Sequence, residues 1–421
     1  MDRPTLSLRE RDRRWASVRA LLQDRNADCL IVVGLSGLWQ FDIYVANEHA
    51  DGIVIFPRDG EPTYLTWTPA YITRHNASND RLGNSWVENW KLGITGKALA
   101  AELKAQGFAE ATIGIVGLAA GGTPIEPDGW VPYGTWADVL AELSNANFLN
   151  LTASFIELML VRSDEELAMM RYAANVGELA CGSMLETIRE GGNENEIFAA
   201  VTGCIYAHGC NPDPGPFLHV GYKNLSWGYS QWLSQGQAAR TLMPGDVAQA
   251  EIFVNYGGIQ SQQQMSVALG PVEEVCHELA AVARASYDAG LSALRPGKTF
   301  QEVSDAMIAP LQAANCWQMT PLIHSLSPNF LVGHLRIGAE RMPGHNAGHG
   351  IKPLPPFGGE RVIKPGMIFE LEPNACLGSW RINIGGTVIV GENGPEPLNE
   401  LPTRMNLIEG YAADTAASPR T

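Results

Sequence analysis

The sequence is poor in charged residues, and basic residues are the scarcer kind. Only 18% of its 421 residues are charged, and 29 basic residues against 45 acidic ones give a formal net charge of −16. Nucleic-acid-binding domains need clustered Lys and Arg to neutralise phosphates, and anionic membrane surfaces attract basic segments. The composition therefore predicts no nucleic-acid partner and no membrane surface, and it is typical of a soluble globular chain.

Cysteine pairs and long apolar runs are missing as well. The seven cysteines are irregularly spaced and form no CxxC pair, which argues against a disulfide framework and a zinc knuckle. Free buried thiols are typical of a reducing compartment. No apolar run reaches the roughly 18 residues of a transmembrane helix, and the charged first fifteen residues do not match a secretory signal peptide. We expect a cytoplasmic protein.

The common nucleophile and nucleotide motifs are also absent. The sequence has no GxSxG, Walker or GxGxxG pattern, and no cysteine lies in a His-rich motif. The sequence therefore does not predict a serine or cysteine nucleophile, or a nucleotide cofactor.

What the chain does contain is two regions of mixed helix and strand patterning. In the first, short apolar strands at residues 28–33 (DCLIVV) and 52–56 (GIVIF) alternate with helical segments, which indicates an α/β domain. In the second, Ser163 and Glu166 have the spacing of a capping box at the start of a long helix. We predict domains at residues 1–155 and 156–421, with about the last ten residues disordered.

Six short segments of this chain follow one another in an order known from other proteins. They are residues 162–167 (RSDEEL), 188–197 (IREGGNENEI), 242–246 (LMPGD), 294–297 (LRPG), 348–350 (GHG) and 364–373 (KPGMIFELEP). Over about residues 6 to 400 the ordered set resembles the pita-bread superfamily of methionine aminopeptidase, aminopeptidase P, prolidase and creatinase. The resemblance implies an α/β N-terminal domain, an α+β pita-bread (creatinase/aminopeptidase fold) catalytic domain and a homodimer.

The resemblance also implies a metal-ligand set, which this chain keeps only in part. Peptidases of the superfamily hold two metal ions with two Asp, one His and two Glu. The matching positions here are Glu251, Gln262, His349, Glu372 and Gly385. Gln262 has an amide where the superfamily has a carboxylate, and Gly385 has no side chain at another carboxylate position. Paired divalent ions need bridging carboxylates. We therefore expect no metal, and a single divalent ion on Glu251, His349 and Glu372 is the alternative.

The retained histidine and glutamates carry the predicted chemistry. His349, between two glycines, is the candidate general acid or base. Glu372 would orient it or bind a cationic group, and a buried Glu251 would be neutral and donate a proton. For every candidate the competing interpretation is a structural one, such as a satisfied core histidine or a polar strand face. The candidate substrate-binding residues are Gln262, Gln264, His345 and His219.

These residues lead to an expected function with several alternatives. We expect a metal-independent hydrolase of creatinase type that cleaves a C–N bond of a small polar molecule, because creatinase resembles this chain in keeping the fold without the metals. A lyase like dimethylsulfoniopropionate lyase, a single-metal Xaa-Pro-type aminopeptidase and a non-catalytic pseudoenzyme, as in chromatin chaperones, stay open. In a homodimer, residues 39–49 and Trp67 of one subunit would cap the active site of the other.

Overall fold

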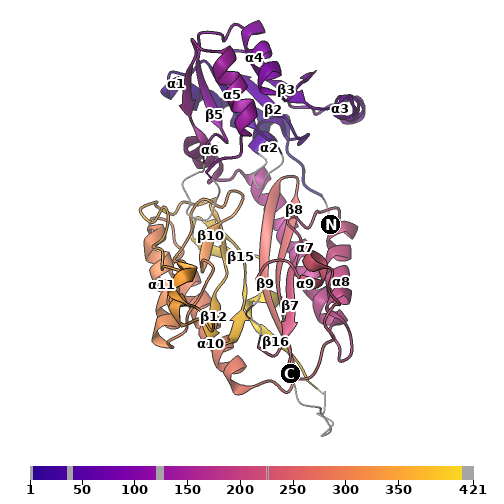
Figure 1. Ribbon diagram of the computed structural model, residues 1–421, viewed down its shortest axis with the longest axis vertical. Coiled ribbons are helices and arrows are strands. Elements are labelled where there is room, and N and C mark those ends of the chain that lie inside the picture. Colours follow the sequence, from indigo (N-terminus) through magenta and orange to yellow (C-terminus); the bar gives the residue numbers. More distant parts are fainter. Residues whose placement is uncertain (1–2, 36–40, 120–127, 224, 226, 410–421) are drawn as a thin grey trace. The chain divides into compact units, whose positions relative to one another are not determined.

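The computed structural model describes residues 3–35, 41–119, 128–223, 225 and 227–409. The predictions on Trp39 and on the last ten residues lie outside this part of the chain. The chain divides into two compact units, residues 2–166 and 167–421, whose elements are labelled in Figure 1. The expected boundary at residue 155 lies inside helix α6 (Thr152–Met159). Within the described ranges, no helix combines the length and the apolar character that crossing a membrane requires.

The N-terminal unit is built on a six-stranded mixed sheet. Its strands are β1 (Cys29–Val33), β2 (Ile53–Pro57), β3 (Thr63–Thr66), β4 (Asn89–Leu92), β5 (Thr112–Val116) and β6 (Asn147–Asn150). Its helices besides α6 are α1 (Leu8–Asp24), α2 (Phe41–Ala46), α3 (Pro69–Leu82), α4 (Gly96–Ala105) and α5 (Tyr133–Glu142). The strand order is β4-β3-β2-β1-β5-β6, and β1 runs parallel to β5. Strands β1 and β2 are buried throughout, and α4 and α5 pack on the sheet through Leu99 and Val139. The predicted α/β domain is confirmed.

The C-terminal unit is built on an eight-stranded sheet and a two-stranded ribbon. The sheet contains β7 (Phe217–Gly221), β8 (Val247–Tyr256), β9 (Ile259–Leu269), β10 (Ile323–Ser325), β11 (Ile368–Leu371), β14 (Gly385–Gly391), β15 (Gly394–Pro397) and β16 (Met405–Ile408). The ribbon pairs β12 (Asn374–Leu377) with β13 (Trp380–Asn383). The main strand order is β10-β11-β14-β9-β8-β7, with β15 beside β14 and β16 beside β9.

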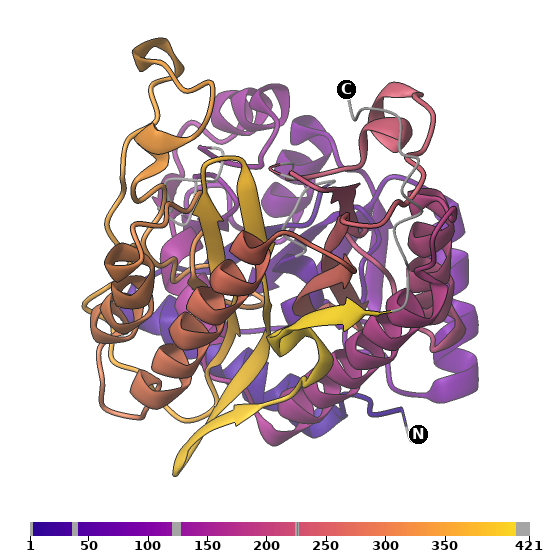
Figure 2. The same cartoon turned by 90° about the horizontal axis from the view of Figure 1, so that it is seen from below.

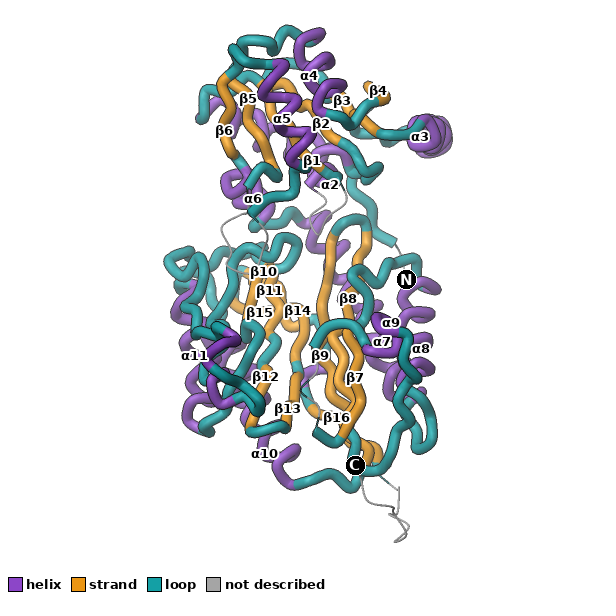
Figure 3. Tube along the Cα trace, in the orientation of Figure 1, coloured by secondary structure: helices purple, strands orange, loops and turns teal. Residues whose placement is uncertain are grey.

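Helices pack against one face of this sheet. They are α7 (Asp164–Thr187), α8 (Glu194–Ala207), α9 (Gln231–Gln235), α10 (Glu274–Ala293) and α11 (Phe300–Ala313). In the view of Figure 3, α7 and α8 lie to the right of the strands, and α10 and α11 lie to their left. Figure 2 shows α10 and α11, both orange, running beside each other, as their mutual contacts require. The predicted pita-bread domain of mixed helices and sheet is confirmed.

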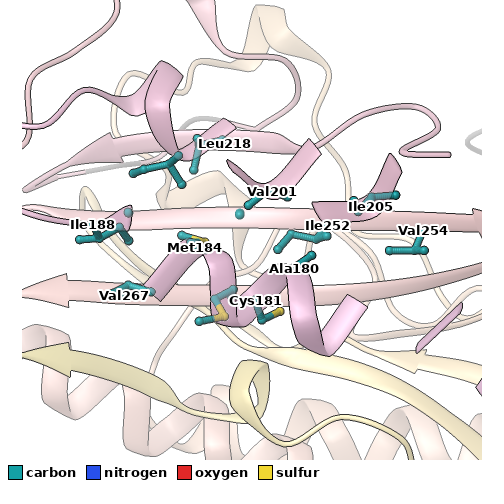
Figure 4. Close-up of a cluster of buried hydrophobic side chains, with 14 of the residues drawn as sticks. Ala180, Cys181, Met184, Ile188, Val201, Ile205, Leu218, Ile252, Val254 and Val267 are labelled. Carbon is teal, nitrogen blue, oxygen red and sulfur yellow. The ribbon is translucent and has the colours of Figure 1, made fainter. Parts of the chain in front are cut away.

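The core between α7, α8 and the sheet decides which side chains reach the candidate site. Figure 4 shows it, with Ala180, Cys181, Met184 and Ile188 of α7, Val201 and Ile205 of α8, and Leu218, Ile252, Val254 and Val267 of the strands. Side chains alternate between the two faces along a strand. The strand residues next to Ile252, Val254 and Val267 therefore point to the face opposite this core. Glu251 on β8 and Gln262 and Gln264 on β9 are therefore directed away from this core.

Candidate functional site

Two glutamates and two glutamines meet on the face of the sheet opposite the α7 core. Glu251 lies directly across from Gln264 in the β8–β9 pair, and Glu372 follows the last residue of β11. Gln262 Nε2 donates to Glu372 Oε2 at 3.1 Å, and Gln264 Nε2 donates to the same oxygen at 2.5 Å. The structure thus brings together four of the residues predicted from the sequence.

The orientation of the Gln264 amide is fixed by its other partner. Asn383 Nδ2 donates to Gln264 Oε1 at 2.7 Å, and Asn383 is itself held by Ser266 Oγ, which lies 3.0 Å from its Oδ1. With its oxygen engaged, Gln264 presents its NH₂ group to Glu372. An amide held in this way donates hydrogen bonds to a carboxylate and does not offer an oxygen ligand to a cation.

A buried arginine lies beside these carboxylates. Arg381 on β13 is 5% exposed, and its Nε donates to Gln249 Oε1 at 2.9 Å. The guanidinium carbon lies 4.0 Å from the ring centroid of Trp227, in cation–π contact. Its Nη1 has no hydrogen-bond partner among the described residues. Arg381 therefore supplies one positive charge in a fixed position, and its Nη1 keeps an unused hydrogen-bond donor.

Burial shifts the pKa of each carboxyl group in the cluster. Desolvation raises the pKa of Glu251, and this is opposed by the charge of Arg381 and a hydrogen bond from Gln264. The pKa of Glu372 lies well above its ordinary value because of burial and the charge of Glu251. Glu370, fully buried on β11, also has a strongly raised pKa, first from burial and then from Glu372. Burial and the like charges of neighbouring carboxylates therefore both favour the protonated form in this cluster.

The imidazole next to this cluster belongs to His324 on β10. Its Nε2 lies 3.6 Å from Glu372 Oε1, and its Nδ1 lies 3.0 Å from the carbonyl oxygen of Ser325. A carbonyl only accepts, so Nδ1 carries the hydrogen and Nε2 keeps its lone pair. Burial lowers the pKa of His324 to about 4, so the ring is neutral at pH 7.

His349 and His345 lie elsewhere, in contrast to the expectation for this site. His349 ends an exposed 3₁₀ turn (Ala347–His349), where Asn346 N donates to its Nδ1 at 3.2 Å. Its ring centroid lies 5.8 Å from that of His345, and His349 is exposed, whereas Glu372 and Glu251 are buried. The flanking glycines shape a surface turn, whereas strand pairing with β11 places His324 beside the carboxylates.

His219 is placed by β7 opposite Gln249. Its Nε2 lies 2.9 Å from the carbonyl oxygen of Gly228, and burial lowers its pKa. This geometry matches the structural interpretation, a core histidine satisfied by the backbone. Of the suggested cap residues, Trp67 lies in the N-terminal unit with 58% of its surface exposed.

Sequence reasoning missed three members of the cluster, His324, Glu370 and Arg381. Glu370 lies between Phe369 and Leu371 in an apolar strand, and His324 and Arg381 each follow one large apolar residue in a short strand. A polar residue in an apolar strand is a signal that could have been used, because a buried polar group needs a partner. The Gly-His-Gly tripeptide drew attention to His349 instead.

The donor set does not fit the pair of metal ions that the resemblance implies. Gln262 replaces a carboxylate with an amide that donates to Glu372. Gly385 has no space for a side chain, because a Cβ there would overlap Leu371 O and press on the Glu372 backbone. Among the residues that the structure describes, no three His, Cys, Asp or Glu side chains are arranged to hold a metal ion. Arg381 contributes a positive charge to the same cluster.

Comparison with known proteins places the chain in a family. The model of metallopeptidase family M24 matches residues 168–392. The chain is similar to the uncharacterized peptidase YqhT of Bacillus subtilis (23% identity over 66% of this chain and 72% of that protein). It is also similar to creatinase of a Bacillus species (21% identity over 62% of each chain).

Solved structures share the fold over nearly the whole chain. Dipeptidase PepE of Mycobacterium ulcerans superposes with a TM-score of 0.71 at 18% identity, covering 96% of this chain and 99% of that one. An X-Pro aminopeptidase of Thermotoga maritima gives 0.71 at 14% identity, covering 94% and 99%. The N-terminal domain of the FACT complex subunit SPT16 of Cicer arietinum gives 0.63 at 13% identity, covering 94% and 97%. The chain belongs to metallopeptidase family M24 and has the pita-bread fold of its prolidase- and aminopeptidase-like members.

Proposed function

We propose that this chain is a hydrolase that cleaves a C–N bond of a small polar molecule without a metal ion. Membership of a family with peptidases and a creatinase supports hydrolysis in general. The observation that carries the finer proposal is the double amide contact to Glu372, from Gln262 and Gln264. Amide donors and the Arg381 charge balance carboxylates that would otherwise need cations.

Glu251 is the general base in this proposal. It is 8% exposed, against 3% for Glu372 and none for Glu370, so it is the carboxyl group of the cluster most accessible to water. Its raised pKa strengthens it as a proton acceptor. Glu251 takes a proton from the water molecule whose oxygen bonds to the substrate carbon.

Glu372 is the general acid. Its Oε2 accepts both amide hydrogens, so the proton favoured by its raised pKa lies on Oε1, the oxygen 3.6 Å from His324 Nε2. Neutral His324, whose Nε2 faces this oxygen, adds no positive charge that would drive the proton off Glu372. When the C–N bond breaks, Glu372 gives the proton to the leaving nitrogen, and the pair of carboxyl groups ends with one proton as it began.

Arg381 acts as the electrophile. Its unpartnered Nη1 provides an N–H group for the oxygen that becomes negative when water adds. The stacking on Trp227 and the bond to Gln249 keep the guanidinium in place before the reaction begins. A homodimer and a cytoplasmic location belong to the same proposal, by resemblance and by composition.

The proposal is tested by metal analysis and by substrate screening of the same preparation. The metal content of the protein is measured by elemental mass spectrometry. The protein is then assayed before and after chelator treatment, with small amidino and ureido compounds as one substrate set and Xaa-Pro dipeptides as the other. We expect turnover of the first set, unchanged by chelation. Glu372→Gln should lower kcat by at least about 100-fold, while Glu278→Gln, an exposed change on α10, should not.

Other outcomes separate the alternatives. Turnover of dipeptides only, and only with added divalent metal, would replace this proposal with the single-metal peptidase. A product mass without the added water would show elimination by a lyase. No turnover of any compound would favour the pseudoenzyme.

A further inference from the structure

A second set of polar side chains lines a cavity of about 350 Å³ in the N-terminal unit. Ser85 Oγ lies 3.2 Å from His75 Nε2, and His75 Nδ1 lies 2.8 Å from Glu48 Oε2. All three residues line the cavity, and they come from different segments: Glu48 follows α2, His75 is in α3, and Ser85 follows α3. The hydroxyl, imidazole and carboxylate thus form one hydrogen-bonded chain.

Neighbouring residues hold His75 and Glu48 of this hydrogen-bonded series in place. His75 is 4% exposed and stacks on Trp90 at 4.4 Å between centroids, and Trp90 stacks on Tyr64 at 4.2 Å. Arg74 Nη2 lies 3.4 Å from the second oxygen of Glu48. The imidazole plane and the carboxylate are therefore held, while Ser85 at the cavity is only half-buried.

We propose that Ser85, His75 and Glu48 form a second hydrolytic site, for small carboxylic esters. Ser85 Oγ bonds to the ester carbonyl carbon while its proton passes to His75 Nε2, and that proton then leaves with the departing alkoxide as an alcohol. Water attacks the acyl-serine, gives one proton through His75 back to Ser85, and releases the carboxylic acid. Glu48 holds the Nδ1–H and stabilises the imidazolium.

The hydroxyl of Ser85 has a second acceptor, and the structure allows it to change partner. Val87 O lies 3.0 Å from Ser85 Oγ, but it also accepts from Trp90 Nε1 at 2.9 Å. The carbonyl therefore keeps a hydrogen bond when the hydroxyl rotates to His75. Asn84 lines the same cavity, and the amide of its side chain is the N–H donor that we assign to the oxyanion. This site does not depend on the carboxylate cluster of the C-terminal unit.

The test is covalent labelling of the full chain with a fluorophosphonate probe, followed by peptide mapping. We expect one label per chain on Ser85, together with hydrolysis of p-nitrophenyl acetate. Ser85→Ala should abolish the label and lower ester hydrolysis by at least about 100-fold, and His75→Gln should act similarly. Ser17→Ala, which changes a serine of α1 that does not line the cavity, should retain both.

Mapping of the unaltered protein keeps the test independent of how the variants fold. A chain that takes no label, or takes it on a residue other than Ser85, overturns the proposal. Ester hydrolysis that persists undiminished in folded Ser85→Ala, checked by circular dichroism, overturns it as well.

Discussion

At the residue scale, the candidate active site is an arrangement of buried acids with few bases. Glu251, Glu370 and Glu372 share the cluster with one guanidinium, Arg381, and with neutral His324. A buried ion is tolerated when it is paired and hydrogen-bonded. Protonation of part of the carboxyl set and the amides of Gln262 and Gln264 meet that requirement.

Removal of Arg381 should lower the stability of the protein. Arg381→Met leaves Gln249 Oε1 without its donor and the carboxylates without a counter-charge, so we expect a loss of about 3 kcal/mol in the free energy of unfolding at pH 7. Arg381→Lys keeps the charge but loses the hydrogen bond from Nε to Gln249. Its free energy of unfolding should lie between those of the parent and of Arg381→Met. Urea denaturation of the three proteins measures this. If the Met variant is as stable as the parent, Arg381 does not balance the cluster.

At the element scale, strands β11 and β14 lie too close together for a side chain at Gly385, the position at which the superfamily has a metal-binding glutamate. Gly385, the first residue of β14, faces Gln264 of β9 and lies against the backbone of Leu371 and Glu372. The sequence alone showed that the carboxylate was missing there, but only the strand spacing shows that it cannot be restored. By contrast, the capping box at the start of α7 was predicted from spacing and is present, with Ser163 N donating to Glu166 at 3.0 Å and Glu166 N to Ser163 Oγ at 3.2 Å.

Gly385→Ala should therefore be strongly destabilising. The added Cβ would overlap Leu371 O, a backbone atom that cannot rotate away, so we expect a loss of about 3 kcal/mol, the upper part of the range for overpacked sites. Gly182→Ala is the matched control, because its Cβ would meet nothing within 4 Å in α7, and it should be neutral or stabilising. Thermal and urea unfolding give both values. Equal stability of the two variants would mean that β11 and β14 can separate.

At the whole-molecule scale, the free energy of unfolding should depend on the titration of His324. Its pKa is about 4 in the folded chain and near 6.5 when unfolded, so between these values the unfolded state binds the extra proton. The contribution of His324 is complete above pH 6.5 and is lost as the pH falls toward 4, about 3 kcal/mol in all. The raised pKa values of Glu370 and Glu372 act with the opposite sign.

The difference between parent and His324→Asn isolates this contribution. Urea unfolding between pH 7 and pH 4 should show the parent losing more stability than the variant as the pH falls. His277→Asn, which removes an exposed histidine from α10, serves as the control for the loss of an imidazole. Parallel curves for parent and His324→Asn would contradict the lowered pKa.

The sequence by itself determined the fold family, because the order of its short segments and the alternation of apolar and polar residues depend only on neighbours along the chain. The resemblance to the superfamily also pointed to Glu251, Glu372, Gln262 and Gln264, because the segments around them match positions of its motifs. The tertiary structure alone decided which imidazole and which cation join them. His324 and Arg381 come from strands far apart in sequence, and their partners are set by pairing across β10–β11 and β12–β13 and by packing. Spacing along the chain carries no information about such contacts, which is why the exposed His349 was expected where His324 lies.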